Sequence, residues 1–474
     1  MLSNDNFECT VAIVGSGFSG TLVATHLLTN PKSKSLRVVL IERAATRFAR
    51  GVAYGTHCFS HLLNVPAGRM SAFIEDKQHF LRWAERHALN VREDDFAPRL
   101  IYGAYLADVL NEAEAAAPHG TSLRRLTDDV VSLDVLENEA GAALKLRSGR
   151  VLHAERVVLA PGNYPPADPR IANPGFYSSK RYLRDPWAEG ALDSIAPTEP
   201  VLLIGTGLTM VDISLALRER GHNAPIHALS RHGLLPQVHR QVPVKASFQF
   251  LLKSPITLRR LLRAVRNEVR DVTDSGYDWR AVLDSLRPIA QDLWRILTYE
   301  ERKRFLRHVR HYWEAHRHRM APQVAAQITR MIDSGQLKIH TGRVQDYREE
   351  GAMVSVLFRN RLTPTDLTLR VGSVINCTGP DCDVRTINDP LMRQLREQGY
   401  IRPDPLGLGL DVAADGALIN ANGETSGTLY TVGALRKGNL WETTAVPEIR
   451  AQCTSLAQLL ADSPRRELRR LRFA

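Results

Sequence analysis

The chain shows the same order of hydrophobic and polar positions twice. The first copy starts with the apolar run and glycines of CTVAIVGSGFSG (9–20), continues through TLVATHLL and reaches a second apolar run, LRVVLIER (36–43). The second copy is PVLLIGTGLTMVDISLALRERG (200–221), followed by PIHALSRHG (225–233). A short apolar run, a glycine turn and a segment of helical spacing are typical of a strand–helix–strand unit with parallel strands. The repeat therefore predicts two α/β domains of the same kind.

The rest of the pattern predicts the elements between the two copies. Residues 76–89 have the spacing of an amphipathic helix with Phe80, Leu81 and Trp83 inward, and 96–117 predicts a second helix that starts after Pro98. Residues 121–160 alternate as strands, and the last of them runs into VVLAPGN (157–163). Residues 173–200 are rich in Pro, Gly and Ser and are predicted to be a linker.

After the second copy the strand–helix rhythm stops and later resumes. Residues 243–335 are predicted to be largely helical and are strongly basic, whereas strands return from 336 and end at Thr378-Gly379-Pro380. Residues 427–460 predict a strand, a glycine turn and a helix. We therefore predict an α/β fold of two Rossmann-like domains of the three-layer ββα type, with a helical insertion in the second. The first domain comprises 1–170 and 371–474, and the second comprises 195–370 with the insertion at about 243–335.

The first glycine cluster has the chemistry of a dinucleotide site. Gly15 permits a tight turn, Gly17 lets the backbone approach a pyrophosphate, and Gly20 lets the helix pack close to the strand. The N-terminus of that helix offers unpaired N–H groups to phosphates. Glu42 ends the next strand, where a carboxylate can accept hydrogen bonds from a ribose. The predicted site also includes Ser16, Phe18, Ser19 and Arg43. The alternative is a glycine-rich turn in another kind of α/β domain.

The second cluster keeps two glycines and changes the rest. Gly205 and Gly207 match the first copy, but Met210 stands at the third glycine position, which predicts looser packing of the helix. Ser230 and Arg231 end the following strand, where the first copy has an acid. An acid favours a free ribose 2′-hydroxyl, whereas an arginine accommodates a 2′-phosphate. We therefore predict FAD in the first site and NADPH in the second, with Thr209 also at the second site. A solvated basic turn is the alternative for Arg231.

Composition narrows the classes of function. The 474 residues are 44% hydrophobic and 24% charged, with a net charge of +11, which suits anionic ligands, and no nucleic-acid-binding motif accompanies the charge. The five scattered cysteines give no disulfide framework, so we predict a reducing cytoplasm. They also lack zinc spacing, and His316 and His318 are two residues apart, so we predict no metal site. We expect no signal peptide before the first strand, and no apolar run is long enough to span a bilayer.

The whole arrangement resembles the two-dinucleotide-domain flavoproteins, and within them the flavin-dependent monooxygenases that hydroxylate amino groups. The segments GVAYGTHCFSHLLNVPAGRMSAF, SRHGLLP, WEAHRHR and NLWETTAVPEIRAQ resemble a bacterial family of FAD/NAD(P)-binding proteins, to which some FAD-dependent urate hydroxylases are similar. The resemblance implies that Asn64 and Val65 lie near the isoalloxazine ring, with Asn64 as the candidate catalytic residue. It implies further cofactor contacts from Val130 at adenine, and from Gly433, Trp441 and Glu442 over the flavin. Ala434 stands where many relatives have an aspartate for the ribityl chain.

Two further strand ends are candidate cofactor contacts, because a small residue followed by a glycine lets the backbone lie close to a ligand. These are Gly162 in the first domain and Thr378 and Gly379 near the second. The helical insertion has three interpretations: a docked helical segment with a solvated basic face, a membrane-surface helix, or a pocket for a substrate carboxylate. The pocket would use Arg310, Trp313, His316, Arg317 or Arg319.

The predicted function is an NADPH-dependent flavoprotein monooxygenase that uses FAD and dioxygen on a small, anionic substrate. One alternative is an FAD-dependent NAD(P)H oxidoreductase that passes electrons to another acceptor, for which Cys377 and Cys382 have C-x₄-C spacing. Another is a flavin-binding sensor with little turnover. The expected partners are the substrate and dioxygen, without nucleic acid or membrane, and the sequence leaves a homo-oligomer open.

Overall fold

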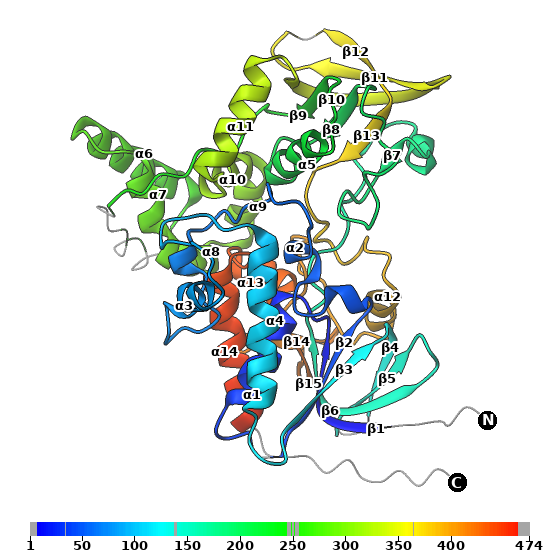
Figure 1. Ribbon diagram of the computed structural model, residues 1–474, viewed down its shortest axis with the longest axis vertical. Coiled ribbons are helices and arrows are strands. Elements are labelled where there is room, and N and C mark those ends of the chain that lie inside the picture. The colour runs from blue at the N-terminus through cyan, green and yellow to red at the C-terminus, as the bar shows by residue number, and fades with distance from the viewer. Residues whose placement is uncertain are drawn as a thin grey trace. The chain divides into compact units, whose positions relative to one another are not determined.

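The computed structural model describes residues 7–33, 35–136, 140–243, 248, 251, 256–363 and 365–462. The chain divides into two compact units, each built around one sheet (Figure 1). Unit 1 comprises Met1–His57, Val65–Tyr164 and Cys382–Ala474, and unit 2 comprises Cys58–Asn64 and Pro165–Asp381.

The sheet of unit 1 has a parallel centre in which β1 lies between β2 and β6. Its strand order is β14-β15-β6-β1-β2-β3, and an antiparallel β4–β5 pair joins through β6. The strands β15, β6, β1, β2 and β3 are parallel to one another, whereas β14 is antiparallel to β15. The bounds are β1 (Phe7–Val14), β2 (Arg37–Glu42), β3 (Ser122–Thr127), β4 (Val130–Val135), β5 (Ala142–Leu146), β6 (Val151–Leu159), β14 (Ala417–Ile419) and β15 (Thr425–Thr431).

Unit 1 has three layers. On one side, α1 (Phe18–Thr29) contacts both α4 (Arg99–Ala115) and α14 (Val446–Asp462) (Figure 1). On the other side, Val39 and Ile41 of the sheet pack with Leu133 of β4 and Leu144 of β5 in one core cluster. Alternate residues of a strand face opposite sides, so the same strand supplies both layers. The shorter helices are α2 (Gly51–Tyr54), α3 (His79–Arg86), α12 (Pro390–Glu397), α13 (Lys437–Leu440), η1 (Ala45–Arg47), η2 (Ala67–Arg69) and η7 (Gly433–Arg436).

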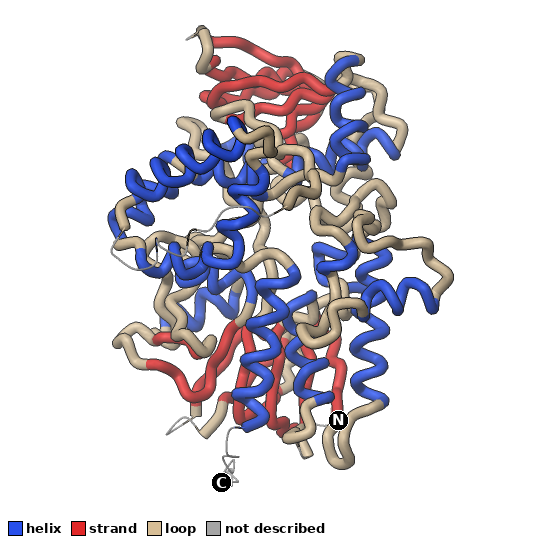
Figure 2. Tube along the Cα trace, turned by 90° about the vertical axis from the view of Figure 1, so that its left-hand side faces the viewer, coloured by secondary structure: helices blue, strands red, loops and turns tan. Residues whose placement is uncertain are grey.

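Unit 2 repeats this plan. Its sheet has the order β12-β11-β10-β9-β8-β13-β7, in which β10, β9, β8, β13 and β7 are parallel and β10–β11–β12 form an antiparallel extension. Figure 2 shows the strands of the chain in red and the helices in blue. The core cluster joins Leu202 and Leu229 of the parallel part to Val356 and Phe358 of the extension. The bounds are β7 (Tyr182–Leu183), β8 (Val201–Ile204), β9 (Ile226–Ser230), β10 (Leu337–Glu350), β11 (Met353–Asn360), β12 (Asp366–Val371), β13 (Ser373–Asn376), α5 (Leu208–Glu219) and α11 (Pro322–Asp333). The predicted fold of two Rossmann-like domains with ββα layers is confirmed.

The helical insertion lies in unit 2. Its helices are α6 (Leu258–Asp274), α7 (Arg280–Leu286), η6 (Arg287–Ile289), α8 (Ala290–Ile296), α9 (Tyr299–His308) and α10 (Arg310–Arg317), while residues 244–247, 249–250 and 252–255 lie outside the described part. The apolar face of α6, which includes Leu261, Leu262 and Val265, is half-buried, and the helix contacts α7 and α9. The prediction of a docked helical segment with a solvated basic face agrees with this packing.

The stretch 173–200 is not a linker, contrary to the sequence-based prediction. It contains η4 (Pro174–Ser178) and β7, which pairs with β13 at the edge of the second sheet. Phe176 and Tyr182 are buried in the core of unit 2, and the ring of Phe176 stacks on that of Tyr347 at 4.5 Å. The high content of Pro, Gly and Ser led to the linker prediction, but the buried aromatic side chains pack the stretch against the sheet.

The second unit also reaches further along the chain than predicted. Residues 371–474 were assigned to the first domain, but β13 inserts between β8 and β7 and unit 2 extends to Asp381. Strand order within a parallel sheet does not follow sequence order, so the chain must run through β13 before it returns to unit 1.

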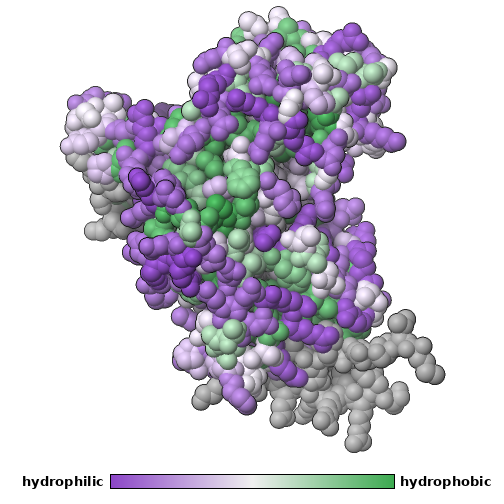
Figure 3. Space-filling view, in the orientation of Figure 1, coloured by the Kyte–Doolittle hydropathy of each residue, from purple (hydrophilic) through white to green (hydrophobic). Residues whose placement is uncertain are grey.

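One face of the molecule is shown by residue hydropathy in Figure 3. Hydrophilic residues cover most of the face in Figure 3, and hydrophobic residues form smaller areas between them. None of the described helices combines the length and the apolar composition that a bilayer-spanning helix needs.

Candidate functional site

The first glycine turn joins β1 to α1 at the carboxyl end of the parallel sheet. Gly15 has φ +100°, and its N–H donates to the carbonyl oxygen of Ile41 at 2.9 Å. A Cβ on Gly15 would lie 2.2 Å from the carbonyl oxygen of Ala160, directly after β6. Only glycine fits this turn, which lies between β2 and β6 at the point where the strand order reverses and ligands bind in such sheets.

The two other glycines bring backbone close to backbone. A Cβ on Gly20 would lie 1.9 Å from the carbonyl oxygen of Gly15, so the first turn of α1 presses on the glycine turn. Gly51 has φ +56°, and a Cβ there would lie 2.8 Å from the Cα of Gly17. Phe18 is buried and packs against the rings of Tyr54 and Tyr102, which fixes the start of α1.

The start of α1 is suited to phosphate. Gly17 is the N-cap, no side chain of the described residues caps it, and no acidic residue lies in the first turn. By contrast, the N-terminus of α12 is capped by the carboxylate of Asp389, which accepts a hydrogen bond from the Met392 N–H at 3.1 Å. The first N–H groups of α1 therefore meet the requirements of a pyrophosphate, whose negative charge the helix end favours.

The second glycine turn reproduces the first at the level of the backbone. Gly205 has φ +113°, donates to the carbonyl oxygen of Leu229 at 2.8 Å, and would carry a Cβ 2.5 Å from the carbonyl oxygen of Cys377. Gly207 caps α5 with ψ −168°, against −167° for Gly17. Met210, at the third glycine position, is fully buried, so the start of α5 accommodates a side chain where the start of α1 does not.

Strand register shows which residues correspond in the two sites. Ile41 and Leu229 each accept the hydrogen bond of the glycine turn, so Glu42 corresponds to Ser230 and Arg43 corresponds to Arg231. The sequence spacing had matched Arg231 with Glu42, which is wrong by one residue. The second site therefore differs by having serine in place of the acid, while both sites have an arginine in the next position.

The acid of the first site is held by the glycine turn. Glu42 Oε2 accepts from the N–H of Ser16 at 3.0 Å and from its Oγ at 3.1 Å, and Oε1 accepts from the Arg43 N–H at 2.9 Å. In the second site, the Oγ1 of Thr206 lies 2.9 Å from the Oγ of Ser230. Each strand end thus bonds to the residue between the first two glycines, which fixes its distance from the phosphate-binding turn.

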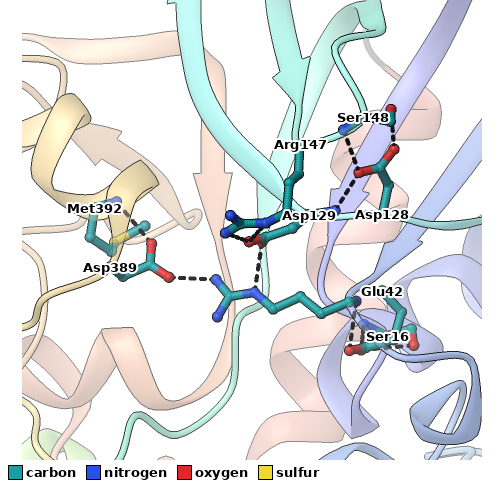
Figure 4. A network of polar contacts seen from close by, with 9 residues as sticks. Ser16, Glu42, Asp128, Asp129, Arg147, Ser148, Asp389 and Met392 are labelled. Atoms are coloured by element: carbon teal, nitrogen blue, oxygen red, sulfur yellow. Dashed lines mark hydrogen bonds and ion pairs between the residues drawn. The ribbon is translucent and has the colours of Figure 1, made fainter.

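Arg43 is paired with two carboxylates, those of Asp129 and Asp389, both of which are labelled in Figure 4. Its Nε donates to Asp129 at 2.7 Å, and a terminal nitrogen pairs with Asp389. Burial disfavours its charge, but Asp389 and Asp129 outweigh that effect and raise the pKa of the Arg43 guanidinium. Val130, predicted to contact adenine, follows Asp129 directly and is buried at the start of β4. The structure thus brings together Glu42, Arg43 and Val130 after β2 and β3.

Arg231 has the opposite surroundings. Its side chain is exposed, and burial of its inner part together with three nearby arginines lowers its pKa. Glu314 opposes this effect in part, but its Oε1 already accepts from the Nε of Arg310 at 2.8 Å. We call the group the arginine cluster; it comprises Arg231, Arg310, Arg343 and Arg361.

The strand end next to the second turn is fixed by Asn376, which the sequence analysis missed. Asn376 is fully buried; its Oδ1 accepts from the N–H and Oγ1 of Thr378 at 3.1 and 2.7 Å, and its Nδ2 donates to the hydroxyl of Tyr182 at 3.0 Å. A polar residue inside the apolar run SVIN was the available signal. Gly162 and Gly379 hold the matching places after β6 and β13, with φ +75° and +90°, and a Cβ on either would meet open space.

The C-terminal segment returns to the first glycine turn. Gly433 has φ +80°, and a Cβ there would lie 2.7 Å from the Oγ of Ser19. Gln452 accepts from the Gly433 N–H at 3.1 Å and donates to the Oγ1 of Thr443 at 2.8 Å, and neither residue was predicted. Trp441 is buried with φ +58°, a backbone conformation that aromatic residues rarely adopt.

Three further residues were predicted to lie near the flavin, and the structure describes their burial. Glu442 is buried next to Trp441. The boundary between the units falls between Asn64 and Val65; Val65 is buried in unit 1, whereas Asn64 is half-buried in unit 2. Their roles near the isoalloxazine ring stay predictions.

Part of the charge of the insertion takes part in internal packing. Arg319 is buried, pairs with Asp284 at 2.9 Å, and lies 5.3 Å from the ring of Trp279. The ring of His316 contacts the same tryptophan at 5.0 Å, and Trp313 contacts Phe305 at 6.5 Å. Of the arginines proposed for such a pocket, Arg310 lies in the arginine cluster, and Arg317 is half-buried on α10.

The cysteines whose side chains the structure describes form no disulfide with one another. Cys58, Cys377, Cys382 and Cys453 are free thiols, and complete burial raises the pKa of Cys377, so that it stays protonated and unreactive. The side chain of Cys9 lies outside the described residues. Within the described ranges no group of three or more His, Cys, Asp or Glu side chains could hold a metal ion.

Known proteins share this sequence and fold in part. A family model described as FAD-NAD(P)-binding matches residues 12–164. Nitrosuccinic acid synthase npaA from Aspergillus oryzae is 33% identical over 146 residues, which are 29% of this chain and 22% of that protein. The match therefore spans about a fifth of the length of this curated relative.

Solved structures resemble the whole chain. Ornithine hydroxylase from Pseudomonas aeruginosa in its reduced form is 15% identical with a TM-score of 0.64, and the match covers 96% of this chain and 98% of that one. Thioredoxin reductase from T. acidophilum is 12% identical with a TM-score of 0.52, over 96% and 98% of the two chains. At these identities the likeness concerns the fold. Residues 12–164 therefore match a family described as FAD-NAD(P)-binding, within a chain whose fold resembles that of ornithine hydroxylase and thioredoxin reductase.

Proposed function

We propose that the chain is an NADPH-dependent flavoprotein monooxygenase that binds FAD in unit 1 and NADPH in unit 2 and hydroxylates a small, anionic substrate with dioxygen. The observation that carries the assignment of cofactors is the pair of glycine turns that share one backbone and differ in charge after the second strand: Glu42 and an ion-paired Arg43 in unit 1, Ser230 and the arginine cluster in unit 2. FAD would supply the redox chemistry, and the chain's residues would position the two nucleotides.

The residues of unit 1 fit FAD. The turn at Gly15 packs so closely on the backbone of Ala160 that it admits no Cβ, and the uncapped start of α1 at Gly17 follows it with N–H groups that suit a pyrophosphate. The carboxylate of Glu42 can exchange its bond to Ser16 for one to a ribose hydroxyl, because Ser16 Oγ and the ribose would compete for the same oxygen. Val130 and the Arg43 ion pairs would then border the adenine. Gly433, which lies against Ser19, would border the flavin end of FAD, and so would Trp441 and Glu442.

The residues of unit 2 fit NADPH better than NADH. Ser230 carries no charge that would repel a 2′-phosphate, and the arginine cluster lies beside it with little carboxylate to neutralise it. Arginine binds phosphate through two parallel hydrogen bonds. We place the pyrophosphate at Gly205 and Gly207, with Thr209 in the first turn of α5, and the dinucleotide beside Thr378 and Gly379.

Hydroxylation is favoured over disulfide reduction. A dithiol reductase needs a reactive thiolate, whereas the Cys377 thiol is buried and its pKa is raised. Ornithine hydroxylase matches the fold with a higher TM-score than thioredoxin reductase, 0.64 against 0.52. The net charge of +11 supports an anionic substrate, and the fungal relative is named for nitrosuccinic acid, a small anion. Asn64 is the candidate hydrogen-bonding neighbour of the reacting flavin edge.

The test is oxygen uptake by the purified, flavin-loaded protein with NADPH and with NADH, over a panel of small acids and amines. The proposal expects a compound that raises NADPH oxidation and gains one oxygen atom from ¹⁸O₂, detected by mass spectrometry. NADPH oxidation that yields peroxide with every compound would contradict hydroxylation, and fast reduction of an added electron acceptor would favour the oxidoreductase. An absence of NADPH oxidation would favour the sensor. Cytoplasmic location and a homo-oligomer stay predictions.

A further inference from the structure

Two histidines lie within the arginine cluster. His232 follows Arg231 after β9, and His311 is the second residue of α10. Their rings are parallel within 4° with centroids 3.7 Å apart, and the ring of Tyr312 lies 4.2 Å from that of His311. Nδ1 of His232 contacts a terminal nitrogen of Arg361. Elements from three distant parts of the chain thus form this stack.

The contact with Arg361 defines the charge of the pair. A guanidinium has only hydrogen-bond donors, so Nδ1 of His232 must be the acceptor and carry no proton, which makes His232 neutral. Two imidazolium rings at 3.7 Å would repel each other strongly, so at most one of the two can be charged. Nε2 of His311 is buried and has no hydrogen-bond partner among the described residues.

The groups facing the pair are nearly all cationic. Burial, His311 and the arginines Arg361, Arg231 and Arg343 lower the pKa of His232 to about 4. The pKa of His311 is lowered by burial, by Arg231 and Arg361 and by His308, while Glu314 raises it in part. Both rings are therefore neutral at pH 7 in the protein without nucleotide.

We propose that the His232–His311 pair takes up a proton when the 2′-phosphate of NADPH binds, so that binding of the phosphorylated dinucleotide is coupled to protons and binding of NADH is not. This inference rests on the proposed NADPH site. A phosphate dianion among the four arginines offsets part of their positive charge, so a proton on the pair is repelled less. The dianion breaks the Arg361–His232 contact by competing for the guanidinium, and Nδ1 of His232 then becomes free to bind a proton and donate to the phosphate.

The sign of the pH dependence follows from linkage. The proton-binding affinity of the pair is higher in the complex than in the free protein, so NADPH binds more tightly as the pH falls towards neutrality and more weakly as it rises above the pKa of the complex. The uptake of one proton makes the dissociation constant rise up to about tenfold per pH unit. Below about pH 6 the phosphate itself gains a proton, which opposes the effect.

The experiment is isothermal titration of the flavin-loaded protein with NADP⁺ and NAD⁺, and with 2′,5′-ADP and 5′-AMP as fragments, between pH 6.5 and 8.5. Buffers of different ionisation enthalpy give the number of protons bound. We expect NADP⁺ and 2′,5′-ADP to take up more than half a proton at pH 7, and NAD⁺ and 5′-AMP to take up almost none. The double variant His232→Phe/His311→Phe keeps a ring stack but cannot titrate, and His232→Asn removes the proton site with little change in volume.

The matched control is His227→Asn. His227 belongs to another histidine pair of the same sheet, 2.9 Å from His340, and is affected by Lys338 instead of the arginine cluster. We expect this variant to retain proton uptake, whereas both His232 variants lose it with 2′,5′-ADP still bound. Uptake that is absent in the wild type, or unchanged in the His232 variants, would overturn the inference but leave the NADPH site intact. Equal affinity for 2′,5′-ADP and 5′-AMP would instead overturn the NADPH site and the inference with it.

Discussion

The two glycine turns share one backbone and differ at the strand end beside them. In both, a glycine of positive φ donates to the neighbouring strand and leaves no room for a Cβ. In unit 1 the next strand ends in Glu42, and Arg43 is neutralised by Asp129 and Asp389; in unit 2 it ends in Ser230, and Arg231 lies among other arginines. In the function proposed above, the backbone of the turns accounts for binding of a dinucleotide, and side-chain charge accounts for which dinucleotide each unit would take.

The largest effect is expected from placing a side chain in either turn. Gly15→Ala adds a Cβ 2.2 Å from a backbone oxygen at φ +100°, and Gly205→Ala adds one at 2.5 Å. Because backbone cannot move as a flexible side chain does, each should cost about 3 kcal/mol or more. We expect Gly15→Ala to lose bound FAD, and Gly205→Ala to keep FAD but lose NADPH oxidation; flavin absorbance and stopped-flow reduction measure the two.

A matched pair of variants makes this comparison sharper. Gly162→Ala also has positive φ, but its Cβ would meet nothing within 4 Å, so it should cost only about 1 kcal/mol. If Gly162→Ala and Gly15→Ala lower the thermal midpoint equally, the close approach of backbone would not be the reason for Gly15.

The next effect concerns the choice of dinucleotide. Ser230→Glu places a carboxylate at the position of Glu42, and Arg231→Ala removes the first cation of the cluster. Each should weaken NADPH binding about tenfold, or about 1.4 kcal/mol, and leave NADH nearly unchanged. The ratio of kcat/KM for the two nucleotides measures this. Arg330→Ala, on α11 and outside the arginine cluster, is the control; an equal loss there would mean that overall charge decides the preference.

A smaller effect is expected at the Arg43 ion pairs. Asp389→Asn keeps a residue that caps α12 well but removes the charge facing Arg43. Because half of the Arg43 side chain is exposed, solvent screens the pair, and we expect a loss of about 1 kcal/mol in unfolding by urea. A double variant with Arg43→Gln tests the assignment, since the two losses should not add if the pair is their cause.

The smallest effect is the acid sensitivity of the two units. Burial lowers the pKa of His26 in unit 1 and of His227 in unit 2 to about 4. The unfolded chain takes up these protons below about pH 6.5 while the folded chain does not, so stability falls as the pH drops from about 6.5 towards 4. At pH 6 the loss is at most about 1 kcal/mol for His26. His26→Gln should remove this pH-dependent loss. The free energy of unfolding of the variant relative to the wild type should therefore rise when the pH is lowered from 7.5 to 6. An unchanged difference would contradict the assignment.

The glycine sites were predictable because their requirements are local. The order of strand, Gly15, Gly17, Gly20 and helix specifies a turn whose conformation depends on adjacent residues, and the copy at Gly205 and Gly207 specifies it again. The same holds for α4 after Pro98, since the cap and the apolar spacing lie within one segment. These patterns alone determined the fold class and the two nucleotide sites.

Tertiary structure alone decided what surrounds those sites. Strand pairing made Ser230, and not Arg231, the counterpart of Glu42, because register depends on hydrogen bonds between strands and not on residue counts. It placed β13 in unit 2 and turned the expected linker at 173–200 into an edge strand. It also brought Arg310, Arg343 and Arg361 to one place and Gly433 to Ser19, contacts across long stretches of chain that no local preference encodes. Charge at the second site is a sum over these distant residues, and therefore exists only once the chain has folded.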